Sequence, residues 1–145
     1  MRSPVARISA IILLLTLLSC SQGPGYPVVE AKEGTIRIPL GSIEENGVHF
    51  FTYRFDGRNI EFFVRRSASG TLHSAFNACF TCYKYHKGFH LEGEDIACSK
   101  CGTRFRAASD NWVVGGCTPI GLPHETDNEA LIIAVADLQG RARLF

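Results

Sequence analysis

Hydrophobic and polar residues alternate along several short segments of the chain, with the period of two that is typical of β-strands. Residues 35–40 alternate in this way, and residues 48–55 are rich in aromatic and β-branched side chains. The sequence Asp-Gly-Arg-Asn at 56–59 is typical of a turn, and the mostly apolar segment 60–65 follows it. Residues 48–65 are therefore predicted to form a hairpin. Further strands are predicted at 71–76, 88–91, 95–97, 103–106, 112–114 and 130–135.

Helical patterns are scarce by comparison. Only residues 83–86 and the stretch after Ser42 are compatible with a helical turn, and residues 137–140 are predicted to form a terminal turn. Short strands separated by turn residues predict a mainly β fold, a small sandwich or barrel, with a cysteine-rich subdomain that binds a metal or a cluster.

The N-terminus has the features of an export signal. Residues 1–7 carry two arginines and no acidic residue, and residues 8–18 are apolar apart from Ser9 and Thr16. This run is shorter than the roughly 20 residues that cross a bilayer. The sequence Leu-Leu-Ser-Cys at 17–20 resembles a bacterial lipobox, so we expect Cys20 to be the lipidated first residue of the mature protein. In the alternative, the segment stays uncleaved as an anchor, and both readings place the domain in the cell envelope, facing the periplasm or the exterior.

Three parts of the chain follow from these patterns. We expect a lipoprotein signal peptide at 1–19, a lipid-anchored flexible tether at 20–33, which begins with several Pro and Gly residues, and one domain at 34–145. The charges nearly balance, with 15 Lys and Arg against 14 Asp and Glu, and this balance does not support a nucleic-acid-binding role. No catalytic set of residues is recognisable, so we expect an electron carrier or metal-binding protein rather than an enzyme.

Four of the six cysteines form two Cys-x-x-Cys pairs, Cys79/Cys82 and Cys98/Cys101, with residues 83–97 between them. This spacing is typical of metal sites, because each tight turn can direct two sulfurs the same way and the intervening segment can form a hairpin. Four thiolates suit a tetrahedral zinc ion or an iron–sulfur cluster. Three classes of protein stay open: an iron–sulfur electron carrier, an accessory protein that binds zinc, copper or iron, and a thiol–disulfide protein.

Other residues near the pairs are candidates for secondary roles. Cys117 follows two glycines and is either a fifth ligand, an alternate ligand or a small buried residue. His86 and His90 lie between the pairs and could replace a ligand, although a surface role is the simpler expectation. The basic residues of this region form either a solvated face or a positive environment for a thiolate site: Lys84, Lys87, Lys100, Arg104 and Arg106. The aromatic residues are expected to form an apolar shell around it: Phe80, Tyr83, Phe89, Phe105 and Trp112.

The cysteines also stand in a recognisable context. The segments Ala-Cys-Phe-Thr-Cys-Tyr at 78–83, Lys-Gly-Phe at 87–89, Cys-Ser-Lys-Cys-Gly-Thr at 98–103 and Gly-Gly-Cys-Thr-Pro at 115–119 resemble the FtrD-like membrane iron–sulfur protein family. The resemblance covers about residues 34–145. It implies an iron–sulfur cluster, a membrane setting that a lipid anchor would satisfy, and a role in electron transfer for bacterial iron transport, with a redox protein or an iron permease as partner.

A weaker resemblance concerns the second pair. Cys-x-x-Cys-Gly-Thr at 98–103 is similar to the second cluster loop of Rieske proteins, with Cys101 at the place of the histidine ligand. The first pair departs from the Rieske pattern, because Cys79-x-x-Cys82 replaces Cys-x-His. This resemblance implies a Rieske-like topology, and all-thiolate ligation would lower the potential of a [2Fe–2S] cluster relative to a Rieske centre.

Overall fold

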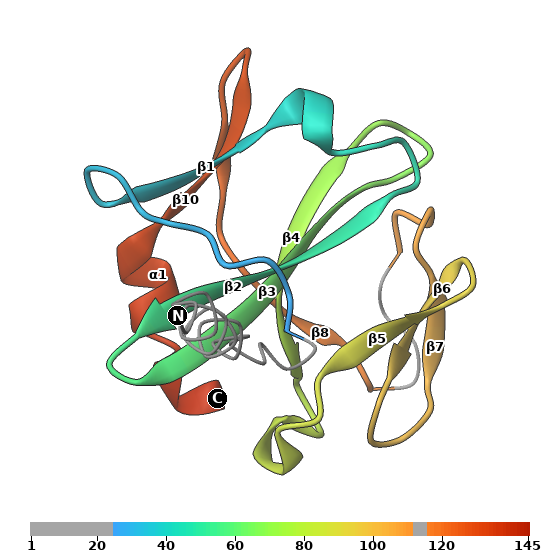
Figure 1. Cartoon of the computed structure of the whole chain (residues 1–145). Helices are drawn as coiled ribbons and strands as arrows, with labels where there is room; N and C mark the ends of the chain where they lie inside the picture. Colours follow the sequence, from blue (N-terminus) through green and yellow to red (C-terminus); the bar gives the residue numbers. More distant parts are fainter. Residues whose placement is uncertain (1–24, 112–115) are drawn as a thin grey trace, which may run out of the picture.

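A computed structural model describes residues 25–111 and 116–145 of the chain. In these residues the strands form three antiparallel sheets, shown in Figure 1. The predicted mainly β fold with a cysteine-rich subdomain is confirmed. The strand predicted at 112–114, together with Trp112, lies outside the described residues, as do the predicted signal peptide and Cys20.

The central sheet has the strand order β2-β3-β4-β8. It consists of β2 (Val48–Phe55), β3 (Arg58–Arg66), β4 (Leu72–Cys79) and β8 (Pro119–Gly121). The predicted hairpin is confirmed, because β2 pairs with β3 along its whole length. Asp56 and Gly57 connect them with φ angles of 48° and 71°, the left-handed conformation that tight hairpin turns require.

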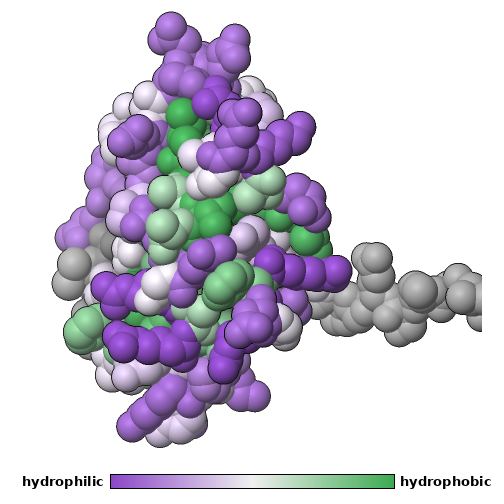
Figure 2. Space-filling model, turned by 90° about the vertical axis from the view of Figure 1, so that its left-hand side faces the viewer, coloured by the Kyte–Doolittle hydropathy of each residue, from purple (hydrophilic) through white to green (hydrophobic). Residues whose placement is uncertain are grey.

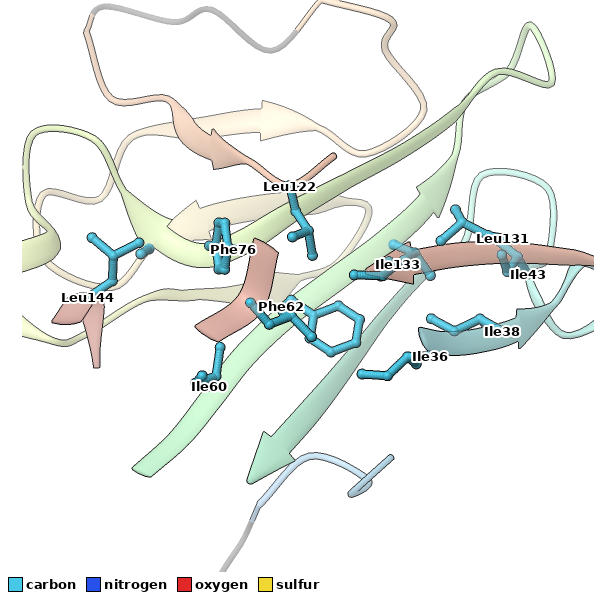
Figure 3. Packing of buried hydrophobic residues seen from close by; sticks show 13 residues of the cluster. Ile36, Ile38, Ile43, Ile60, Phe62, Phe76, Leu122, Leu131, Ile133 and Leu144 are labelled. Carbon is cyan, nitrogen blue, oxygen red and sulfur yellow. The ribbon is translucent and has the colours of Figure 1, made fainter. Parts of the chain in front are cut away.

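A second sheet covers one face of the central sheet. Its strands are β1 (Thr35–Pro39), β10 (Ala130–Ala134) and β9 (Glu125–Thr126), in the order β1-β10-β9. Figure 3 shows side chains of β1 and β10, among them Ile36 and Ile133, facing Phe62 of β3 across this interface. Removal of each of these side chains from water stabilises the packing of the two sheets by on the order of 1.5–3 kcal/mol.

Three short helices complete this layer: η2 (Leu40–Ser42), α1 (Val135–Gln139) and η4 (Ala142–Leu144). The prediction of a simple turn at 137–140 is wrong, since these residues belong largely to α1. The helical turn buries Leu138 completely in the core, and η4 buries Leu144, which an open turn would leave in water. The side of the molecule that carries α1 shows a narrow hydrophobic strip between hydrophilic residues, the ordinary appearance of a water-facing surface (Figure 2).

The third sheet carries the second cysteine pair and lies on the opposite face of the central sheet. It consists of β5 (Phe89–Glu92), β6 (Asp95–Cys98) and β7 (Arg104–Arg106) in sequence order. Phe62 belongs to the first core and its neighbour Phe63 to a second core with Phe89 and Phe105, so β3 is buried on both faces. This explains the unbroken apolar run at 62–64 of β3, which does not alternate.

The segment expected to be a tether packs against the domain in its described part. The Val29 N–H donates to the Thr52 carbonyl at 2.9 Å, and the Thr52 N–H donates to the Pro27 carbonyl at 2.8 Å. Tyr26 stacks on Phe50 with ring centroids 4.7 Å apart. The ordered domain therefore begins before residue 34, because Tyr26 and Val29 find apolar and hydrogen-bonding partners along β2. Residues 20–24 of the expected tether lie outside the described residues.

Candidate metal centre

Three separate segments bring five cysteines to one end of the central sheet. Cys79 ends β4 and Cys82 follows in the next turn, Cys98 ends β6 and Cys101 lies in the turn before β7, and Cys117 precedes β8. The hairpin predicted between the two pairs is confirmed, because β5 pairs with β6 and places Phe89 opposite Cys98. Cys117 joins them because β8 pairs with β4, with Pro119 opposite Cys79.

The sulfur atoms lie in two overlapping groups. The Sγ atoms of Cys79, Cys82 and Cys98 all lie within 4.8 Å of one another, and so do those of Cys98, Cys101 and Cys117. Cys117 makes the closest contacts, at 3.1 Å from Cys79 Sγ and 3.4 Å from Cys101 Sγ. Sulfurs around a tetrahedral ion stand roughly 3.8 Å apart, given a metal–sulfur distance of about 2.3 Å. The 4.8 Å limit within each group is compatible with this spacing, while Cys117 Sγ lies closer to Cys79 Sγ than two ligands of one ion would. The site has one sulfur more than a tetrahedral ion requires.

Local hydrogen bonds shape both Cys-x-x-Cys turns. In the first turn the Cys82 N–H donates to the Cys79 carbonyl at 3.2 Å, and in the second the Gly102 N–H donates to the Cys98 carbonyl at 2.9 Å. Gly102 has a φ of 73°, which a residue without a side chain adopts without strain. The Thr81 hydroxyl donates to the Gly116 carbonyl at 2.5 Å and links the first turn to the segment of Cys117.

Two of the cysteines have lowered pKa values. The Thr103 hydroxyl and the Thr103 N–H lower the pKa of Cys101 to about 6. Burial by itself raises the pKa of Cys79, but hydrogen bonds from the Cys117 thiol and from the Cys82 and Thr81 N–H groups outweigh it, so that the net shift is downward. These groups stabilise negative charge on sulfur, as a thiolate ligand requires.

The other two shifted cysteines favour the protonated form. Burial, followed by the charge on Cys79, raises the pKa of Cys82 to about 12. Burial and the hydrogen bonds to Cys79 and Cys101 also raise the pKa of Cys117. Binding of a metal to Cys82 would therefore release a proton, since only the thiolate is a ligand.

The histidines between the pairs have other partners. His86 Nδ1 lies 3.0 Å from the Leu144 carbonyl, and His90 Nδ1 lies 2.8 Å from the Ser99 hydroxyl. Within the described part of the chain, neither belongs to a group of metal-ligating side chains with the cysteines. The expected surface role of the two histidines therefore agrees with their exposure.

Some of the basic and aromatic residues near the cysteines have ion-pair or core partners, and others are exposed. Arg104 and Arg106 pair with Glu92 and Glu94 on the β5–β6 hairpin, at 2.5 and 2.8 Å. Phe89 and Phe105 form the expected apolar shell, since both are buried. The expectation was wrong for Phe80 and Tyr83, whose exposed fractions are 71% and 44%. Because both follow directly on a cysteine of the first turn, they point outward where that turn leaves the sheet.

Within the described residues no helix is long and apolar enough to cross a membrane. The family whose model matches residues 43–145 is described as membrane iron–sulfur containing protein FtrD-like. None of the curated proteins compared with the chain matches it.

The solved structures with a partial likeness to the chain include that of a Rieske monooxygenase. It is the crystal structure of the quaternary ammonium Rieske monooxygenase CntA in complex with an inhibitor, with a TM-score of 0.45 and 16% sequence identity. The alignment covers 72% of this chain and 32% of that one, so this chain spans about a third of the enzyme's length. The predicted Rieske-like topology stays a prediction. The family match spans most of the domain and all five clustered cysteines, and the chain thus belongs to the FtrD-like family of membrane iron–sulfur proteins.

Proposed function

We propose that Cys79, Cys82, Cys98 and Cys101 hold an iron–sulfur cluster and that the protein is an electron-transfer accessory in bacterial iron transport. The convergence of the two Cys-x-x-Cys turns on one small volume carries this proposal. An all-sulfur donor set selects zinc, Cu(I) or iron–sulfur clusters from the metals common in proteins. The two overlapping groups of sulfurs favour a centre with more than one metal ion, and the family description supports iron–sulfur over zinc.

Cys117 is proposed to support the cluster rather than to bind it. Its burial favours the protonated thiol, which lies 3.1 Å from Cys79 Sγ and can donate a hydrogen bond to it. Such hydrogen bonds stabilise negative charge on the ligand sulfurs. The N–H groups of Thr81 and Cys82 act in the same way on Cys79, and the hydroxyl and N–H of Thr103 act on Cys101. A bound cluster would supply one-electron redox chemistry, and hydrogen bonds to its sulfurs would raise its potential.

We also propose a lipid anchor at Cys20, with the domain facing the periplasm or the exterior. The family's membrane setting and the lipobox-like sequence support this location. Cys20→Ala should abolish labelling of the protein by a fatty-acid analogue in cells. Equal labelling of the wild-type protein and the variant would contradict a lipid anchor at this residue.

The visible spectrum of the purified protein, with analysis of iron, zinc and acid-labile sulfide, tests the proposed cofactor. We expect a brown protein in which iron and sulfide occur together. A colourless zinc protein would instead indicate a zinc-binding accessory.

A thiol–disulfide protein is the second candidate, because Cys79 and Cys117 have sulfurs only 3.1 Å apart and neither forms a disulfide in the structure. In that case the purified protein would hold no metal. Oxidation of two thiols to a disulfide would lower the mass of the protein by two hydrogen atoms, and reduction of the disulfide would restore the original mass.

A further inference from the structure

An apolar and basic surface borders the accessible edge of the cysteine site. We name it the basic aromatic patch and define it by seven side chains: Phe80, Tyr83, Lys84, Tyr85, Lys100, Arg141 and Arg143. Its three aromatic residues are 71%, 44% and 48% exposed, although aromatic side chains normally gain by burial. Three exposed aromatic residues within six positions of the chain therefore point to a surface that is covered by a partner.

The members of the patch are connected through Tyr85 and Tyr83. The Nζ atoms of Lys84 and Lys100 lie 5.7 and 4.4 Å from the centre of the Tyr85 ring. Next along the chain, Tyr83 and Phe80 line one cavity together with Arg141 and Arg143 from the C-terminal segment. The patch therefore continues from the second cysteine turn across the first turn to the C-terminus.

Of the five cysteines in the described residues, the two most accessible are part of the same region. Cys101 is exposed and follows Lys100, while Cys82 is half-buried and precedes Tyr83. Cys79, Cys98 and Cys117 are buried. A protein docked on the patch would therefore contact the edge at which the sulfurs reach the surface.

The charges of the patch are not balanced by neighbours. In residues 25–111 and 116–145, the basic side chains that form ion pairs all lie outside the patch: Arg37, His73, His90, Arg104 and Arg106. Lys84, Lys100, Arg141 and Arg143 have no acidic partner in this part of the chain. The patch therefore carries four basic side chains without an acidic partner among the described residues, on a chain whose total charge is nearly neutral.

We propose that the basic aromatic patch is the docking surface for an acidic redox protein that exchanges electrons with the cysteine-bound centre, an inference that rests on the proposed function. A positive field around the site would steer an acidic partner to it, and aromatic and arginine side chains are enriched where proteins bind each other. A patch of this small size suits a weak, transient electron-transfer complex. An anionic lipid surface has similar chemistry, but it would cover the sulfur edge that electron exchange needs.

The first test is lysine footprinting of the full-length protein in phosphatidylcholine nanodiscs, with flavodoxin as a small acidic redox probe. Flavodoxin should protect Lys84 and Lys100 from acetylation and leave Lys32, on the β1 side of the domain, unprotected. Nanodiscs that contain phosphatidylglycerol, without flavodoxin, should not protect Lys84 and Lys100. Protection by the anionic lipid alone, or equal protection of all three lysines by flavodoxin, would overturn the proposal.

The second test measures electron exchange by stopped-flow. Flavodoxin hydroquinone gives up one electron and the oxidised cluster takes it up, with no bond made or broken. The double variant Lys84→Glu/Lys100→Glu should lower the second-order rate constant about tenfold at low ionic strength, and added salt should reduce this difference. The control Lys32→Glu/Arg54→Glu makes the same change in charge at two exposed residues that do not belong to the patch. It should leave the rate constant within about twofold of the wild-type value.

The two tests separate this inference from the proposed function. If the purified protein holds no cluster, the proposed function fails, while the footprint still reports whether the patch binds an acidic protein. If the cluster is present and both double variants exchange electrons equally fast, the patch is not the docking surface and the proposed function stands.

Discussion

At the scale of single residues, spacing in the sequence predicted the two Cys-x-x-Cys pairs, and the structure brings their sulfurs together. The spacing did not settle the role of Cys117, because its position depends on the pairing of β8 with β4. This pairing brings Cys117 next to Cys79, which lies 38 residues earlier in the sequence. The contacts of Cys101 with the hydroxyl and the N–H of Thr103 were not predicted either. A threonine two residues after a cysteine has no fixed geometry until the turn is formed.

Thr103→Val should raise the pKa of Cys101 from about 6 toward the usual range of a thiol, because the variant loses the hydroxyl that stabilises the thiolate. At pH 7 the thiolate would then become a minor form. The alkylation rate of Cys101 as a function of pH measures this change as the difference between the variant and the protein that keeps Thr103. Both are metal-free and have their other cysteines replaced by serine, which also removes the weaker contributions of Cys98 and Cys117. Thr103→Ser keeps the hydroxyl and should keep the low pKa, and an identical profile for both variants would contradict the assignment.

Cys117→Ser should reduce the iron content without abolishing it, because the variant removes a supporting thiol and leaves the four proposed ligands in place. Iron analysis of the purified variant provides the measurement. Complete loss of iron would show that Cys117 is a ligand and that one of the other four cysteines is not.

At the scale of elements, a buried amide holds the segment between the cysteine pairs against the central sheet. The Phe89 N–H donates to Asn77 Oδ1 at 2.6 Å, and Asn77 Nδ2 donates to Glu61 at 2.8 Å. Gly88 has a φ of 60° and lies so close to this amide that an added Cβ would come within 2.7 Å of Asn77 Oδ1. The position of β5, and with it that of Cys98, thus depends on this contact.

Gly88→Ala should lower the free energy of unfolding by about 1–3 kcal/mol, through strain at a left-handed φ and through the clash with Asn77. Thermal or denaturant unfolding measures the loss. Gly70→Ala is the matched control, since Gly70 has a φ of 85° and nothing within 4 Å of an added Cβ. If Gly88→Ala cost no more stability than Gly70→Ala, the contact with Asn77 would not be a significant constraint.

At the scale of the whole molecule, segments with alternating or continuous apolar, aromatic and β-branched residues predicted most of the strands, because such residues suit a sheet that is buried on one or both faces. The short strands β8 and β9 were missed, since three and two residues are too few to show a period. The position of residues 26–29 along β2 was also missed, because their Pro content resembles a linker and only the fold supplies their partners. The packing of the three sheets in layers was not predicted either, because it depends on contacts between segments that are distant in the sequence.

The cysteine site should also stabilise the domain, because it ties the turn after β4 to the turn after β6. Serine substitution of Cys79, Cys82, Cys98 or Cys101 should each remove metal and lower the melting temperature together, since metal-binding free energy is partly folding free energy. Melting curves and metal analysis of the four variants provide the measurement. A variant that retained both metal and stability would identify a residue that is not a ligand.

X-ray absorption at the iron edge tests the proposed cluster most directly. We predict that iron bound to the purified full-length protein has only sulfur neighbours in its first shell, because cysteines and no histidine converge at the described site. We also predict a second iron close by, since an iron–sulfur cluster of the proposed kind contains more than one iron. A first shell of nitrogen or oxygen, or sulfur-bound iron without a neighbouring iron, would contradict an iron–sulfur cluster at this site.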